Sequence, residues 1–160
     1  MKRRVLKFGG SSVADFTKIK NIAEMLKRRV DDGEQLIVVV SAMGKTTDQL
    51  MENVSHLTTT PKDEELALLL TTGEQQTVSY LSMVLNDIGV SARAMTGYQA
   101  GIKTVGHHLK SRIAEINPEI FNKEFKDKDV LVVAGFQGVN DELELTTPVS
   151  YTHLTLPTKR

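Results

Sequence analysis

The sequence contains no cysteine, so it can form no disulfide and offers no thiolate as a metal ligand or a nucleophile. It has no excess of either charge, because twenty Lys and Arg residues balance twenty Asp and Glu residues. We therefore expect no general attraction to nucleic acid or to an anionic membrane. Long hydrophobic runs are also missing, since Leu36 to Val40 is far shorter than the roughly 20 apolar residues of a membrane-spanning helix.

The basic N-terminus, Met1 to Lys7, is not followed by an apolar segment of signal-peptide length. Together with the missing hydrophobic runs, this predicts a cytoplasmic protein. The 160 residues, 40% of them hydrophobic and 25% charged, predict about one globular domain.

Short apolar runs alternate with helical periodicity along the first part of the chain. Val5 to Phe8 and Leu36 to Val40 are predicted strands, and Ile19 to Val30 places apolar side chains at 3.6-residue spacing between them. Leu36 to Val40 is apolar at consecutive positions, as expected for a parallel strand covered on both faces. Strand, helix and strand in this order predict a βαβ unit. Ser12, with Asp15 three residues later, is the predicted N-terminal cap of its helix.

The alternation continues along the chain. Further elements are predicted as helices over residues 49–56, 62–70, 75–88 and 119–125, and as strands over residues 90–95 and 130–134. Thr71 to Glu74 is predicted to interrupt the helical pattern between two of them. This order predicts an α/β fold in which helices cover a mostly parallel sheet.

Three predicted strands end in small or polar residues: Gly9 to Ser12, Ser41 to Gly44 and Gly135 to Gly138. Ligands of open α/β sheets bind at the carboxyl ends of the strands, and glycine lets the backbone come close to them. Backbone N–H groups at a helix N-terminus suit phosphate. Each segment alone is compatible with an ordinary turn. The three together, with Lys7 before the first, favour a nucleotide or a phosphorylated ligand.

Two short motifs lack the residues that their usual functions require. Gly44-Lys45-Thr46 is similar to the end of a P-loop, but Val39 stands where that motif needs its first glycine. No GxGxxG motif occurs, so bound ATP would be held by another fold. The adjacent His107 and His108 have neither an HExxH frame nor a nearby cysteine, so we expect exposed loop residues and no metal site.

Two charged residues have both an ordinary and a functional interpretation. Lys7 could be a surface charge, or its ammonium could neutralise the charge that develops on a transferring phosphoryl group. Glu74 could cap a helix end, or its carboxylate could pair with a substrate ammonium.

Five segments, in the same order, resemble the signatures of aspartate kinases, which belong to the amino-acid kinase superfamily. They are Lys7 to Asp15, Val39 to Asp48, Thr71 to Glu74, Thr96 to Gly101 and Val133 to Gly138. The resemblance covers about Val5 to Thr147. It implies a three-layer αβα sandwich with a mostly parallel sheet, incomplete at its C-terminus, in which residues 1–147 are the N-terminal portion of the catalytic domain.

The resemblance also implies an activity: ATP-dependent phosphorylation of the side-chain carboxylate of L-aspartate to 4-phospho-L-aspartate, at the entry to lysine, threonine and methionine synthesis. The implied site residues are Lys7 at the transferring phosphoryl group, Phe8, Gly9 and Gly10 at the ATP phosphates, and Ser41, Thr47 and Glu74 at the aspartate. Mg²⁺ would accompany ATP. The partners would be L-aspartate and ATP, without nucleic acid or membrane, and the full-length protein would be an oligomer.

The sequence departs from the family after Thr147. Aspartate kinases continue with Leu-Gly-Arg-Gly-Gly-Ser-Asp, whose arginine binds the substrate α-carboxylate, whereas Pro148 to Tyr151 stands here. Residues 148–160 are therefore predicted to be an irregular tail foreign to the family, and the C-terminal ACT regulatory domains lie outside this sequence. We expect this chain to be inactive alone.

Two alternatives stay open. One is a kinase of the same superfamily that acts on another amino acid or on a nucleoside monophosphate, although the Thr-Gly-Glu and Phe-Gln-Gly segments resemble the aspartate branch best. The other is a non-catalytic fragment or binding module that retains the fold. The presence of Lys7, Thr47 and Glu74 argues against long drift from a catalytic ancestor.

Overall fold

A computed structural model of the protein describes residues 1–148. Its elements, in chain order, are β1 (Lys2–Phe8), α1 (Phe16–Asp31), β2 (Glu34–Val40), α2 (Thr46–Ser55), α3 (Asp63–Asp87), β3 (Ala92–Met95), β4 (Ile102–His107), β5 (Lys110–Ile116), α4 (Pro118–Glu124), β6 (Val130–Ala134), β7 (Gly138–Val139) and β8 (Leu145–Thr146). Within this part of the chain, no helix has both the length and the apolar character needed to cross a bilayer.

Four parallel strands form the central sheet, called sheet A, in the order β1-β2-β6-β3. The predicted parallel sheet is therefore confirmed. All five residues of β6 are buried, as expected for a strand covered on both faces. In β2, Leu36, Val38 and Val40 are fully buried, whereas Ile37 and Val39 on the other face are only partly covered.

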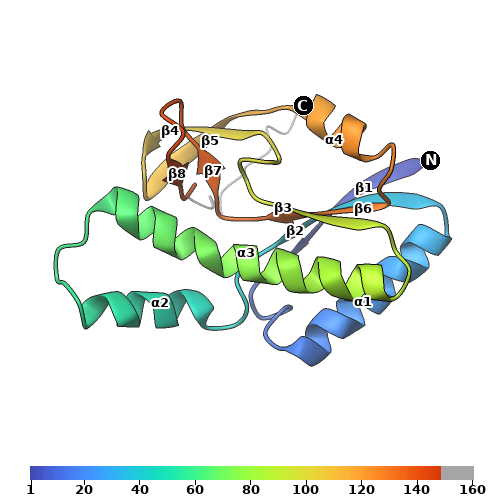
Figure 1. Cartoon of the computed structure of the whole chain (residues 1–160), viewed down its shortest axis with the longest axis horizontal. Helices are drawn as coiled ribbons and strands as arrows, with labels where there is room; N and C mark the ends of the chain where they lie inside the picture. Colours follow the sequence, from blue (N-terminus) through green and yellow to red (C-terminus); the bar gives the residue numbers. More distant parts are fainter. Residues whose placement is uncertain (149–160) are drawn as a thin grey trace, which may run out of the picture.

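Helices α1 and α3 cover one face of sheet A, and Figure 1 shows α4 and a second, mixed sheet on the opposite side. The larger core lies between sheet A and the two helices, where Leu26 of α1 and Leu85 of α3 are completely buried. A smaller core around Leu131 and Val133 lies on the other face, against Phe121 of α4. The α/β fold is confirmed. Its outer layer contains sheet B, in the order β5-β4-β7-β8, which the sequence did not predict.

Helix α3 runs without a break over 25 residues, so the predicted interruption at Thr71 to Glu74 is wrong. The hydroxyls of Thr71 and Thr72 donate to Leu68 O and Leu69 O within the helix, which satisfies them without ending it. Tertiary packing along the buried face of α3 outweighs the low helix propensity of this short segment.

Helix α1 is capped by Asp15, so the prediction of Ser12 as its cap is wrong. Asp15 has extended backbone angles, φ −147° and ψ 170°, and its Oδ1 accepts a hydrogen bond from Lys18 N at 2.8 Å. Ser12 lies earlier, in a turn closed by a hydrogen bond from its own N–H to Gly9 O. The glycine turn thus ends before the helix begins.

Replacing Asp15 by alanine is expected to lower the free energy of unfolding by about 1 kcal/mol, because the first turn of α1 loses its side-chain acceptor. The matched control is Ser12→Ala, which leaves the cap in place and should change stability little. Urea denaturation of both variants checks this. Equal losses would show that Asp15 has no particular capping role.

Candidate active site

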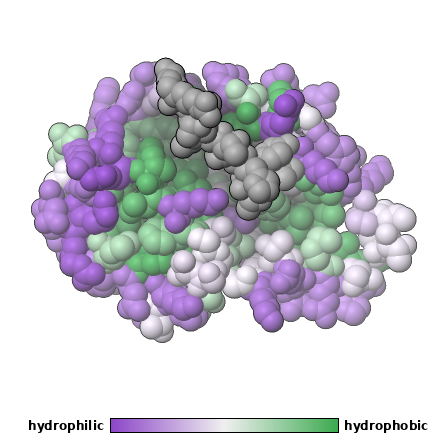
Figure 2. Space-filling model, turned by 180° about the vertical axis from the view of Figure 1, so that it is seen from behind, coloured by the Kyte–Doolittle hydropathy of each residue, from purple (hydrophilic) through white to green (hydrophobic). Residues whose placement is uncertain are grey.

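A cleft of about 650 Å³ lies where β1, β2 and β6 of sheet A end and sheet B begins. Its apolar wall includes Val5, Val39, Val133, Ile102, Ile113 and Ile116. Figure 2, seen from the side opposite to Figure 1, shows hydrophobic residues gathered around a hollow. Because the carboxyl ends of parallel strands are the usual ligand site of open α/β sheets, this cleft is the candidate active site.

The structure brings five of the seven predicted site residues to this cleft: Lys7, Gly10, Ser41, Thr47 and Glu74. The other two, Phe8 and Gly9, do not line it. Phe8 packs against the core between sheet A and the helices, and the carbonyl of Gly9 accepts the hydrogen bond that closes the first turn.

Backbone hydrogen bonds join the three glycine-containing turns. Ser41 N donates to Phe8 O, Gly44 N donates to Gly10 O at 3.1 Å, and Gly135 N donates to Val40 O at 2.9 Å. A side chain at Gly10 would place its Cβ 3.0 Å from Ala42 O, so the first two turns approach too closely for a larger residue. The turns therefore form one connected edge of the cleft, as their positions at the strand ends predicted.

Lys7 and Glu74 reach the cleft from different elements. Lys7 is the penultimate residue of β1 and points to the face opposite Leu6 and Phe8, because successive side chains alternate along a strand. Glu74 comes from the middle of α3. Gly73 allows α3 to pack closely there, since a Cβ on Gly73 would lie 2.9 Å from Ala42 Cβ. The only ionisable side chains that line the cleft within residues 1–148 are these two.

Glu74 is 3% exposed, and its two carboxyl oxygens differ. Oε1 accepts a hydrogen bond from Ala42 N at 3.2 Å, whereas Oε2 is buried without a partner among the described residues. Burial raises the pKa of Glu74 to about 7, against the opposing effect of backbone hydrogen bonds. A buried oxygen without a donor is costly, so the arrangement suits a ligand that donates hydrogen bonds to it.

The segment that follows β6 contributes residues to which the sequence assigned no individual role. Phe136 has φ 55°, which is unusual for a bulky residue, and this residue, which lines the cleft, is 41% exposed. Next to it, Gln137 is almost completely buried and also lines the cleft. Their signals in the sequence were their place after a buried strand and their membership of the Val133 to Gly138 segment that resembles aspartate kinases.

Gly97 lies against this segment, and a Cβ there would be 2.5 Å from Gln137 O and 2.9 Å from Gln137 C. Gly97→Ala is therefore expected to lower the free energy of unfolding by roughly 1–3 kcal/mol, because backbone must move to accept the methyl group. In the matched control Gly9→Ala, the Cβ meets nothing within 4 Å. Chemical denaturation of both variants tests this, and a tolerated Gly97→Ala would contradict the close approach.

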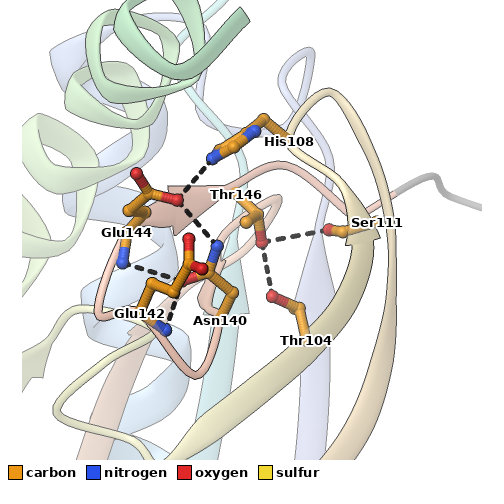
Figure 3. Close-up of polar contacts among 7 residues, drawn as sticks. All are labelled: Thr104, His108, Ser111, Asn140, Glu142, Glu144 and Thr146. Atoms are coloured by element: carbon orange, nitrogen blue, oxygen red, sulfur yellow. Dashed lines mark hydrogen bonds and ion pairs between the residues drawn. The ribbon is translucent and has the colours of Figure 1, made fainter.

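Each of the two adjacent histidines contacts a carboxylate near the β4–β5 turn. His107 is exposed, as predicted, and its Nε2 lies 2.9 Å from Asp63 Oδ2. His108 is partly buried, so the prediction of an exposed residue is wrong there, because its Nε2 lies 2.8 Å from Glu144 Oε2 (Figure 3). Hydrogen bonds from Asn140 and His108 hold the pKa of Glu144 below its usual value. No group of three or more His, Asp or Glu side chains within residues 1–148 is arranged as a metal site.

The model of the amino acid kinase family matches residues 2–150, and the chain belongs to this family. The aspartokinase of Bacillus sp. strain MGA3 is 43% identical over 143 residues, and aspartokinase 2 of Bacillus subtilis is 42% identical. Each alignment covers 89% of this chain and 35% of the relative, so the chain spans about a third of the length of these relatives. The resemblance to aspartate kinases is confirmed.

Two solved structures of aspartate kinases are also similar to this chain. The aspartate kinase from Synechocystis has a TM-score of 0.74 and 36% sequence identity, over 94% of this chain and 24% of that one. E. coli aspartokinase III in complex with aspartate and ADP has a TM-score of 0.70 at 17% identity, over 92% of this chain and 43% of that one. The second likeness concerns the fold alone.

Proposed function

We propose that this chain is the aspartate-recognising part of an aspartate kinase, an enzyme that transfers the γ-phosphoryl group of ATP to the side-chain carboxylate of L-aspartate. The observation that carries the proposal is Glu74, a buried carboxyl with one unpartnered oxygen in a cleft that Lys7 also lines. A substrate ammonium would give Glu74 Oε2 the donor that it lacks. Ser41 and Thr47 line the same cleft and are the proposed polar contacts of the rest of the aspartate.

The proposed reaction needs few protein groups. A carboxylate oxygen of aspartate, already ionised at neutral pH, attacks the γ-phosphorus, the bond to the β-phosphate oxygen breaks, and ADP leaves. Lys7 would neutralise charge on the transferring group, and the backbone N–H of Gly10, the residue of the first glycine turn that lines the cleft, would meet the phosphates. The described residues form no carboxylate cluster for Mg²⁺, so the ion is expected to enter with ATP, coordinated by its phosphates.

The relatives support this choice within the family, since those named above are aspartokinases and one solved relative holds aspartate and ADP. Several expectations stay predictions: the assignment of residues 1–147 to the N-terminal part of the catalytic domain, an oligomeric full-length protein, a cytoplasmic location and the inactivity of this chain alone. Pro148 pairs with Ser111 in a parallel bridge and lines the cleft, whereas the rest of the proposed foreign tail lies outside the described residues.

A chimera tests the proposal. Residues 2–147 would replace the aligned segment of Bacillus subtilis aspartokinase 2, and ADP formation would be measured with aspartate, with glutamate and without an acceptor. We expect turnover with aspartate only, and none for the isolated 160-residue chain. A folded chimera that binds ATP without turnover would favour the non-catalytic module. A preference for glutamate would favour another kinase of the superfamily.

A further inference from the structure

Gln137 is a buried amide that joins two segments beside the cleft. Its Nε2 donates a hydrogen bond to Thr71 O at 3.0 Å, and its Oε1 accepts one from Gly97 N at 3.1 Å. The side chain is 2% exposed, so water does not compete with these bonds. The nitrogen and the oxygen of the amide therefore each have a partner, as is usual for buried side-chain polar atoms.

Thr71 lies one helical turn before Glu74 on the buried side of α3. Two hydrogen bonds therefore hold this turn of α3 at the end of sheet A. Ala42, which follows β2, donates to Glu74 itself, and Gln137, which follows β6, donates to the carbonyl of Thr71. Because β2 and β6 are paired neighbours, the two bonds fix the turn against adjacent strand ends.

The backbone that carries Gln137 has little freedom to move. A Cβ on Gly135 would lie 3.0 Å from Val40 O, and one on Gly138 would collide with the Thr104 side chain. Between them, Phe136 adopts the left-handed conformation, which directs the next residue into the protein. The closely packed backbone therefore holds the Gln137 amide in position against α3.

We infer that Gln137 is a positioning residue, whose amide holds the Thr71–Glu74 turn of α3 against the end of β6 and thereby keeps Glu74 dry and in place for a substrate amine. The inference rests on the proposed role of Glu74. Glutamine suits this position because its amide offers Thr71 O an additional donor and Gly97 N an acceptor. Methionine and leucine offer neither group.

The test measures the titration of the Glu74 carboxyl by NMR in the 160-residue chain, without substrate. Gln137→Met removes both hydrogen bonds at similar volume, and Gln137→Leu removes both with a branched side chain of similar size, without adding a charge near Glu74. In both variants we expect the pKa of Glu74 to fall from about 7 to below about 6, because the loosened turn admits water. If the first variant does not fold, the same titration is measured on the second.

The control is Val90→Ala, a buried substitution just beyond the C-terminal end of α3, which should lower stability without moving the Glu74 titration. If the Gln137 variants lose stability as Val90→Ala does, yet leave the titration of Glu74 unchanged, Gln137 is merely structural and the inference fails. Because this measurement uses no substrate, it stays decisive even if the chimera fails to phosphorylate aspartate. The two failures are therefore distinguishable.

Discussion

Replacing Lys7 by methionine is expected to lower the rate of phosphoryl transfer by roughly 100- to 1,000-fold, the usual effect of removing one group that stabilises transition-state charge. Lys7 lines the cleft and is the cation nearest the glycine turn in sequence. Its side chain is exposed and forms no ion pair in the part of the chain that the structure describes. The substitution should therefore change the free energy of unfolding by less than about 0.5 kcal/mol.

The measurement is kcat in the chimera, together with urea denaturation of the isolated chain. Lys2→Met is the matched control, since Lys2 is an exposed lysine at the opposite end of β1 and lies outside the cleft. It removes the same charge without touching the site. A Lys7→Met chimera that keeps a rate within a few-fold of the parent would exclude Lys7 from the chemistry.

Replacing Glu74 by glutamine is expected to remove a pH-dependent loss of stability. Between pH 4 and pH 8, the free energy of unfolding of the parent should fall by roughly 3 kcal/mol relative to that of the variant. Burial raises the pKa of Glu74 from 4.5 to about 7, so the folded state holds the proton more tightly than the unfolded state. Well below pH 4.5, Glu74 is protonated in both the folded and the unfolded state, and its burial costs no stability. As pH rises to about 7, the unfolded state ionises first and stability falls, after which the loss is constant. Glutamine has no proton to lose.

Denaturation of the parent chain and of Glu74→Gln at several pH values measures this difference. Glu64→Gln, an exposed position on the same helix, is the control and should show no such trend. Parallel stability curves for the parent and Glu74→Gln would mean that Glu74 titrates as an ordinary carboxyl. In the chimera, Glu74→Gln should raise KM for aspartate by about 100-fold, because the substrate ammonium loses its charged partner, with KM for ATP little changed.

The central sheet could be predicted because its two inner strands, β2 and β6, are mostly buried, whereas β1 is largely exposed. β6 and the part of β2 from Leu36 onward consist of apolar, mostly β-branched residues, a pattern typical of buried strands in so short a segment. The turns that follow such strands are then brought to one edge by topology alone. The turn after β1 and the turn that contains Ser41 could be placed together for that reason, whereas Glu74, in the middle of α3, was placed with them only by the resemblance to aspartate kinases.

The β4–β5 hairpin, the continuity of α3 and the contacts of Gln137 could not be predicted in the same way, and the last two depend on segments that are distant in the sequence. The β4–β5 hairpin is largely exposed on both faces, so its sequence lacks the alternation that marks a half-buried strand. The continuity of α3 depends on packing against Ala42, which local propensity does not report. Gln137 could not be recognised because its two partners, Thr71 and Gly97, belong to segments that only the folded chain brings together.

The position of β1 at the border of sheet A affects how separate copies of this molecule behave toward each other. Within residues 1–148, β1 pairs on one side only, with β2, and its seven residues include Lys2, Arg3, Arg4 and Lys7. If the β1 edge strands of two copies paired, these cations would lie within about 5 Å of one another. Their mutual repulsion opposes the growth of intermolecular sheets, and added salt weakens it. Dilute buffers of low ionic strength therefore favour the separate chain.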